Sequence, residues 1–383
     1  MSPNGIVRIP PLVVGVSILD ITMAMAENLP STMNGAMYHG KSAQSAGGVG
    51  RNLAESICKI YGSVNFISVI GQDCLGDILL KLMPKALGHN IERLPMHRTS
   101  SCTVIIDKDG DCKLILGDME IHEKFHQSYI SKRQELLNKA PLVIIDGNLP
   151  RDTIVYILEQ ARLFRIPVFF EPTDLRIAGR PFQIIPGSLT QQIRLITPNY
   201  AELDNLVAAV CPAKQQTRVI PDFDSFEKLL ASVQSLLHVI HDRFDCIVVT
   251  LGQHGVVLSL KACIDPYKCG LFLNNRYVLG LVGTTKNAIH RIIFFPTPFV
   301  VKRVVNVSGA GDSFAGGFIS GLLKEYTVTQ SIALGFMAAS KALQTAAAVP
   351  HEFFTPGYLE SPLWMKRMKA LTKPGNANEK QLS

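Results

Sequence analysis

Short apolar runs rich in β-branched and aromatic residues alternate along this 383-residue chain with stretches in which apolar residues recur at helical spacing. Strands that are buried on both faces give such continuous apolar runs. The alternation therefore predicts an α/β fold, in which a mostly parallel, doubly wound sheet is covered by helices on both faces. The runs expected to form strands are residues 12–18, 64–70, 142–145, 167–170, 194–196 and 246–250. The stretches expected to form helices are residues 52–61, 75–82, 151–163, 200–210 and 226–239.

Two segments interrupt the alternation. Residues 21–46 are polar and irregular, whereas residues 100–118 alternate like two hairpin strands around the turn formed by residues 107–110. We expect these two segments to form a small β lid over the edge of the main sheet.

The last part of the chain differs in composition from the rest. Residues 261–300 place asparagines, glycines and prolines between apolar patches, which predicts a loop insertion. Towards the C-terminus the proline, glycine and basic content rises. We therefore expect one large domain over residues 1–350 and a loosely held tail over residues 351–383.

Composition and charge restrict the partners that this chain is expected to have. It is 47% hydrophobic and 18% charged, which suits a large core and excludes general disorder. The formal net charge of +7 is spread along the chain apart from a basic tail, so no nucleic-acid partner is expected. No apolar run approaches the roughly 18–20 residues that span a bilayer, and no secretory signal pattern begins the chain, which predicts a cytoplasmic protein without a membrane partner. The eight cysteines form no C-x-x-C pair and are expected to be reduced packing residues.

Two short matches to known motifs have unsuitable surroundings. The sequence GAMYHGKS, residues 35–42, has P-loop spacing, but no buried strand precedes it and no apolar helix follows it. The sequence HEKFH, residues 122–126, has the spacing of a zinc peptidase motif, but no suitable third ligand follows. We expect a polar helix start with exposed histidines there, and a zinc peptidase would require a bound metal.

The strongest local signal for chemistry is the run VNVSGAGDSF, residues 305–314, which predicts a strand, a glycine turn and a helix start. The backbone of Gly309, Ala310 and Gly311 could approach an anion, and the helix dipole would favour charge on a transferred phosphoryl group. Asp312, in the first helical turn, could accept a proton from an attacking alcohol. Composition alone leaves open a plain glycine-rich helix start that Asp312 caps.

A second glycine cluster, GGVGRN at residues 47–52, opens another helical stretch. It is not a dinucleotide-binding fingerprint, because Leu53 stands where the third glycine should be and no strand precedes it. Gly47 and Gly48 could let a small polyol approach the backbone, with Asn52 reaching its hydroxyl groups. A plain glycine loop is the alternative.

Together these motifs resemble the PfkB, or ribokinase-like, family of sugar kinases over nearly all of residues 11–350. The sequence GGVGRNLAESICKIYGSVNFISVIGQDCLGDILL is similar to the first family signature, and VNVSGAGDSFAGGFISGLL to the second. Between them, TPNYAELDNL and VTLGQHGV stand at the expected places. The resemblance implies a three-layer α/β/α fold with a β lid, ATP and Mg²⁺ as cofactors, and transfer of the γ-phosphoryl group to a primary sugar hydroxyl.

The resemblance also implies how the acceptor is bound. Asp20 and Asn52, with the backbone of Gly47 and Gly48, would bind sugar hydroxyls. The variants GGVGRN, GDMEI and DGNLP look most like family members that phosphorylate the nucleoside pseudouridine, and Asn148 is the expected partner of its uracil edge. Another nucleoside or sugar, such as adenosine or ribose, is the alternative acceptor, and a non-catalytic binding protein on the same scaffold is the alternative function.

The other implied roles concern ATP and the metal. Asn199 would help to order the metal and its waters beside the ATP phosphates, Glu202 would hold Mg²⁺ through water, and Thr250 and Gly252 would line the nucleotide site. Asp312 would be the catalytic base. The anion hole would consist of Gly309, Ala310 and Gly311.

Departures from the family pattern leave two properties open. Asn306 and Ser308 replace the residues usual in the second signature, so dependence on a monovalent cation is not fixed by the resemblance. In some relatives the lid pairs between subunits, which makes a homodimer through the lid one expected assembly.

Overall fold

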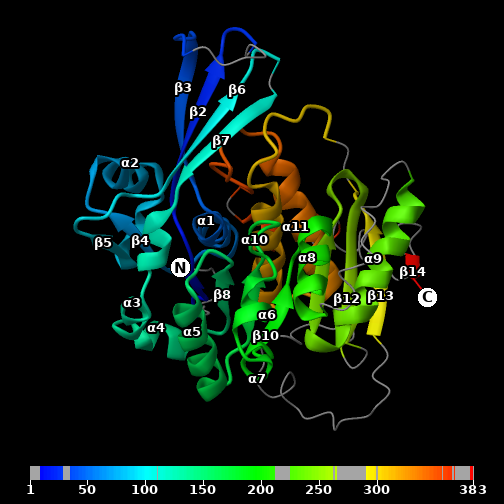
Figure 1. The fold of residues 1–383 in the computed structure, drawn as a ribbon. Helices are drawn as coiled ribbons and strands as arrows, with labels where there is room; N and C mark the ends of the chain where they lie inside the picture. The colour runs from blue at the N-terminus through cyan, green and yellow to red at the C-terminus, as the bar shows by residue number, and fades with distance from the viewer. Residues whose placement is uncertain are drawn as a thin grey trace.

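The computed structural model describes residues 9–28, 35–109, 111–211, 225–261, 264, 290–298, 301–355, 357–364, 366 and 380–382. Its centre is a ten-stranded sheet with the order β14-β13-β12-β11-β10-β9-β8-β1-β4-β5 (Figure 1). The strands from β11 to β5 run parallel to their neighbours, and β12, β13 and β14 add on antiparallel. The strands are β1 (Leu12–Val14), β4 (Asn65–Gly71), β5 (Ile91–Leu94), β8 (Val143–Asp146), β9 (Val168–Glu171), β10 (Ile193–Ile196), β11 (Cys246–Thr250), β12 (Gly255–Lys261), β13 (His290–Pro296) and β14 (Lys380–Leu382).

Helices cover both faces of this sheet, and the result is three layers. One face carries α1 (Val49–Tyr61), α10 (Ala310–Leu323) and α11 (Val328–Ala342), and the other carries α5 (Arg151–Phe164), α8 (Tyr200–Val210) and α9 (Phe226–Ile240). Successive strand residues face opposite layers, so that Val13 packs with Phe318 while Val14 belongs to the core around Leu206. The shorter helices are α2 (Cys74–Leu82), α3 (Ser128–Ser131), α4 (Gln134–Lys139), α6 (Arg180–Ile184) and α7 (Gly187–Thr190). The 3₁₀ helices are η1 (Lys85–Asn90), η2 (Glu120–Lys124), η4 (His241–Arg243), η5 (Gly252–His254) and η6 (Tyr358–Glu360).

The predicted α/β fold is confirmed, and the expected strands and helices are present with small shifts of their ends. Two strands differ from their predictions. Residues 305–307, expected to form a strand before the glycine turn, form none. Residues 12–18 do not form a single strand, because β1 ends at Val14 and the chain leaves the main sheet there. Gly15 packs directly against the backbone of Gly50 at the start of α1, where a Cβ on Gly50 would lie only 2.6 Å from the Cα of Gly15.

A smaller sheet projects beyond the main one at the top of Figure 1. Its order is β3-β2-β6-β7, with β2 (Ile18–Met25), β3 (Gly40–Gly47), β6 (Ser101–Ile106) and β7 (Cys112–Asp118). The hairpin expected in residues 100–118 is confirmed, whereas residues 21–46 are not irregular throughout, because most of β2 and all but the last residue of β3 lie in them. Most of β3 is exposed, so polar residues are tolerated there. They leave no apolar pattern that would indicate a strand.

The first part of the expected C-terminal tail is packed rather than loosely held. Phe353, Leu359 and Trp364 are buried in one cluster with Leu334 and Met337 of α11. The predicted loop insertion at residues 261–300 lies for the most part outside the described residues.

The HEKFH stretch was predicted to begin an exposed helix, and this prediction is wrong. His122 lies in the 3₁₀ helix η2 and is only 6% exposed, because Ile121 and Phe125 beside it are part of the core. Only His126 is exposed, as predicted. Across the described part of the chain, no helix combines the length and the apolar character that crossing a membrane requires.

The contact between Gly15 and Gly50 predicts a position-specific effect on stability. Gly50→Ala should lower the free energy of unfolding by about 1–3 kcal/mol, since its methyl group would meet backbone atoms that cannot move without shifting β1 or α1. Urea unfolding measures this change. The matched control is Gly187→Ala on α7, where a Cβ meets nothing within 4 Å, and the change should stay within about 0.5 kcal/mol. Equal changes in the free energy of unfolding for the two substitutions would contradict the close contact between Gly15 and Gly50.

Candidate active site

The carboxyl ends of the parallel strands bring several of the predicted residues together. Asp146 ends β8, and Asn148 follows it. Asn199 follows β10 and forms an isolated bridge with Thr250, the last residue of β11. In open α/β sheets, ligands bind at this edge of the sheet.

The two glycine motifs meet through a hydrogen bond between their helices. Asn52 Nδ2 on α1 donates to Asp312 Oδ2 on α10 at 2.6 Å, although the two residues are 260 positions apart. The helices can approach closely because Gly316 of α10 faces Ser56 of α1, where a Cβ would lie 2.4 Å from the serine Cβ. The structure thus places the expected proton acceptor and the expected acceptor-binding amide in one site.

A buried arginine orients this amide. The guanidinium of Arg51 donates to the carboxylate of Glu55, to Oδ1 of Asn52 and to backbone carbonyls just before the helix. Because its oxygen accepts from Arg51, the amide of Asn52 turns its nitrogen towards Asp312.

Asp20 on β2 lies directly over Gly47 of the paired strand β3. A Cβ at Gly47 would fall 2.0 Å from Asp20 Oδ2, so only glycine leaves room for this carboxylate. Gly48 has a φ of 90°, a conformation that favours glycine, and turns the chain into α1. Burial raises the pKa of Asp20 to about 6, the charge of Arg51 opposes this rise, and the charge of Asp312 adds to it.

The predicted glycine turn opens α10. Gly309 is the N-cap with a φ of 76°, and a Cβ there would lie 2.2 Å from the carbonyl oxygen of Ala348. Gly311 is different, because a Cβ there would meet nothing within 4 Å. The protein alone therefore requires glycine at 309 but leaves open space beside 311. Asn306 Oδ1 accepts from the backbone N–H of Ser308 at 2.9 Å and supports the same turn.

The protonation of Asp312 suits a general base. Burial raises its pKa to about 6, while the hydrogen bond from Asn52 and the charge of Arg51 hold the pKa below what burial alone would give. The carboxylate is therefore mostly ionised at pH 7, and its pKa is close enough to that pH for efficient proton transfer.

A cavity of about 750 Å³ opens beside the glycine turn. Residues from both predicted groups line it: Thr250 and Gly252 of the expected nucleotide site, and Ala310 and Gly311 of the expected anion hole. Its apolar lining comes from Val256, Val301, Val304, Val307, Phe314, Phe336, Ala339 and Leu343.

Asn199 and Glu202 form a reciprocal cap at the start of α8. Asn199 Oδ1 accepts from the backbone N–H of Glu202 at 2.9 Å, and Glu202 Oε2 accepts from that of Asn199 at 2.8 Å. Burial raises the pKa of Glu202 to about 7. Glu171, which ends β9, is buried nearby, and burial together with the charge of Glu202 raises its pKa well above its ordinary value. Two carboxylates that repel each other in a buried place suit a hard divalent cation.

Comparison with known proteins identifies the family. Residues 13–268 and 290–351 match the pfkB family of carbohydrate kinases. The chain belongs to this family. It is therefore a phosphotransferase with an alcohol group as acceptor.

The similar proteins include two pseudouridine kinases and one ribokinase of known structure. The pseudouridine kinase of Arabidopsis thaliana is 24% identical over 366 residues, covering 90% of this chain and 93% of that protein. The pseudouridine kinase of Escherichia coli (strain K12) is 22% identical over 311 residues, covering 79% and 82%. The structure of Arabidopsis thaliana ribokinase complexed with ribose and ATP superposes with a TM-score of 0.66 and 19% identity, covering 91% of this chain and 97% of that one. This likeness confirms the three-layer ribokinase-like fold.

Sequence analysis of this pfkB kinase did not single out three buried charged residues of the site: Arg51, Asp146 and Glu171. Asp146 and Glu171 each end a strand that is buried along its whole length. A carboxylate directly after a buried apolar strand is a signal that could have identified them. Arg51 lies inside the GGVGRN motif, but nothing in the sequence indicates that its guanidinium is buried.

The different surroundings of the two glycines predict different effects of alanine. Gly309→Ala should lower the free energy of unfolding by about 1–3 kcal/mol, because alanine is strained at this φ and its methyl group would meet Ala348. Gly311→Ala should leave stability unchanged or raise it by up to about 1 kcal/mol, since it replaces an exposed helical glycine. Urea unfolding without nucleotide measures both. A loss of stability in Gly311→Ala as large as in Gly309→Ala would contradict the open space beside residue 311.

Proposed function

We propose that this pfkB kinase uses ATP to phosphorylate the 5′-hydroxyl of pseudouridine, which gives pseudouridine 5′-phosphate. The hydrogen bond between Asn52 and Asp312 carries the catalytic part of the proposal, since it joins an acceptor-binding group to a proton acceptor. The names of the two pseudouridine kinases to which the chain is similar support the choice of acceptor.

In the proposed reaction, the hydroxyl groups of the ribose bind Asp20 and Asn52, next to the backbone of Gly47 and Gly48. The 5′-hydroxyl then lies beside Asp312, whose carboxylate accepts its proton as the oxygen bonds to the γ-phosphorus. The bond from the γ-phosphorus to the oxygen that bridges it to the β-phosphate breaks, and ADP leaves with that oxygen. Proton transfer is late in a loose phosphoryl-transfer transition state, so a carboxylate with a pKa of about 6 is basic enough.

ATP is proposed to bind in the 750 Å³ cavity, with the adenine among the apolar side chains and with Thr250 and Gly252 beside it. The phosphates would reach the turn of Gly309, Ala310 and Gly311, where the first amides of α10 and its dipole favour negative charge. The open space beside Gly311 supports this approach.

The residues around Glu202 fit the Mg²⁺ that the family resemblance implies. Glu202 and Glu171 supply carboxylate oxygens, and their mutual repulsion would be relieved by a divalent cation. We propose that Glu202 holds the ion through water, with Asn199 beside it. When bound, Mg²⁺ would neutralise part of the phosphate charge.

The base of pseudouridine is joined to ribose through carbon and therefore carries one more N–H group than the base of uridine. Asn148, half-buried two residues after Asp146, is proposed to supply a donor and an acceptor to this base. The lid formed by the smaller sheet would cover the acceptor. Met23 on β2 and Leu116 on β7 are exposed on one face of the smaller sheet and support pairing of two lids in a homodimer.

A panel of acceptors with γ-labelled ATP tests the proposal. We expect kcat/KM for pseudouridine to exceed that for uridine, adenosine and ribose by about 100-fold or more, since a site that pairs with an N–H group rejects compounds without it. The control is Asp312→Asn, which should lower kcat by about 10²–10⁴-fold while ATP still binds. A preference for ribose or adenosine would overturn the acceptor, and equal turnover in Asp312→Asn would overturn the catalytic base.

The bond from Asn52 also predicts a change in the pH dependence of kcat. Its N–H group stabilises the ionised form of Asp312, so Asn52→Ala should raise the pKa of Asp312 and move the acidic limb of the profile upwards by about 1 pH unit. The difference in kcat between wild type and variant, measured at saturating acceptor, should therefore be largest between pH 6 and pH 7.

The matched variant for this experiment is Asn148→Ala, which removes the other amide proposed to contact the acceptor. It should raise the KM of the acceptor and leave the acidic limb in place. An acidic limb that does not move in Asn52→Ala would show that Asp312 does not set it.

A further inference from the structure

Two histidines and an aspartate gather at the end of the sheet opposite to the active site. His241 and Asp242 lie in η4, just after α9, and His290 is the first residue of β13. One ligand atom from each of these side chains lies within 4.8 Å of the others. His290 pairs with Lys261, whereas Pro296 at the other end of β13 pairs with Gly255, which lines the 750 Å³ cavity. The cluster is therefore about 20 Å from that cavity along the strand.

Two of the three separations among these atoms are close to those of metal ligands, and all three are within 4.8 Å. Asp242 Oδ1 lies 2.9 Å from His241 Nδ1 and 3.7 Å from His290 Nε2. In a tetrahedral zinc site with bonds of about 2.0–2.2 Å, two ligand atoms lie about 3.3–3.6 Å apart. A shift of a few tenths of an ångström would make both separations suitable, and Asp242 can supply it because its side chain is 76% exposed.

The imidazole of His290 has no other partner that would explain its position. Its side chain is only 3% exposed, and neither ring nitrogen has a hydrogen-bond partner among the described residues. His241 Nδ1 is also buried without one, because its contact with Asp242 lacks hydrogen-bond geometry. The two rings lie side by side, with their centroids 4.4 Å apart. Buried polar groups are nearly always paired, so three unpaired imidazole nitrogens at one place point to an unseen ligand.

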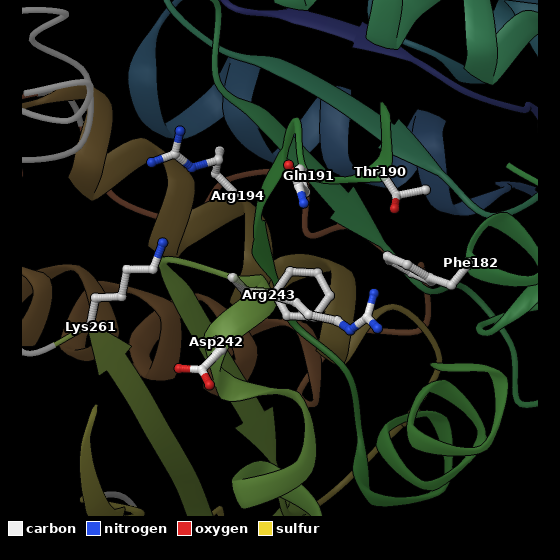
Figure 2. Close-up of a pocket in the computed structure, with 8 residues that line it drawn as sticks. Phe182, Thr190, Gln191, Arg194, Asp242, Arg243 and Lys261 are labelled. Atoms are coloured by element: carbon white, nitrogen blue, oxygen red, sulfur yellow. The ribbon is translucent and has the colours of Figure 1, made fainter. Parts of the chain in front are cut away.

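The charged neighbours of the cluster are compatible with a bound cation. Lys261 Nζ donates to Asp245 Oδ1 at 2.6 Å, and the same carboxylate binds the guanidinium of Arg194. Lys261 and Arg194 line a pocket with Asp242 and Arg243, and Figure 2 shows the Asp242 carboxylate and the Arg243 guanidinium pointing to opposite sides. The Asp242 carboxylate is in contact with the two histidines instead.

We propose that His241, Asp242 and His290 bind a divalent transition-metal ion such as Zn²⁺, with the fourth position open to water. Two imidazole nitrogens and one carboxylate are a donor set that Zn²⁺ accepts, and hard Mg²⁺ does not favour it. The ion would join the end of α9 to β13 and would brace the antiparallel part of the sheet. This role is separate from phosphoryl transfer.

Titration calorimetry of the full chain with ZnCl₂, in the presence of excess MgCl₂ and without nucleotide, tests the proposal. The wild type should bind one more equivalent of Zn²⁺ than His241→Gln or His290→Gln does. If these variants still bind that equivalent, the wild type should bind it at least about 100-fold more tightly. Asp242→Asn should weaken the same equivalent. Zn²⁺ should raise the Tm of the wild type by roughly 2–4 °C and leave that of His241→Gln unchanged.

His238→Gln is the matched control, because His238 is exposed and its ring lies 6.0 Å from that of His241, outside the proposed ligand set. It should keep the full Zn²⁺ affinity. If the buried His290→Gln fails to fold, His241→Gln and Asp242→Asn carry the test, with circular dichroism to check their folding. Equal Zn²⁺ binding in the wild type and in these two variants, or an equal loss in His238→Gln, would overturn the site whatever the kinase activity.

Discussion

Three backbone amides from separate parts of the chain converge on one buried carboxylate, that of Asp146. They belong to Val16, Gly50 and Asn148, at distances of 2.8, 3.0 and 3.0 Å. α1 has no capping side chain of its own, so Asp146 accepts from one of its first amides, that of Gly50, and stabilises the positive end of its dipole. Asn52 lies in the first turn of the same helix, where its backbone N–H bonds to the carbonyl of Gly48 at 2.8 Å. The carboxylate that anchors the helix therefore also fixes where Asn52 meets Asp312, and the active site depends on it.

Several buried carboxylates lie close together at this edge of the sheet. Their arrangement suits proton transfer and ligand binding, but it lowers the stability of the fold. The pKa values of Asp20 and Asp312 are raised to about 6 and that of Glu202 to about 7, in each case chiefly by burial. Burying like charges costs free energy, and Arg51 is the cation that offsets part of it. Groups with such pKa values change protonation near neutral pH. Bound ligands and bound protons can therefore both alter the net charge of these carboxylates.

The layered fold could be predicted from the sequence because its cause is local: strands buried on both faces must be apolar throughout, as β8 and β11 are. The smaller sheet was only half predicted, since the exposed residues of β3 are held by backbone pairing, which leaves no apolar pattern. The glycine motifs pointed to Asn52 and Asp312, and the structure joins them. Arg51 was missed because its burial results from packing between distant segments, which no local pattern records.

The residues proposed for phosphoryl transfer and for acceptor choice lie mostly in different parts of this fold. Asp312 and the glycine turn lie on α10, whose close approach to α1 at Gly316 leaves little freedom for change. Two of the residues expected to contact the acceptor come from elsewhere: Asp20 from the smaller sheet and Asn148 from the loop after β8. Exposed strands tolerate new side chains as long as their backbone pairing is kept. Acceptor contacts can therefore change while the transfer site stays intact. For this reason the side chains of β2, β3 and β6 indicate the acceptor better than a ribokinase-like backbone does.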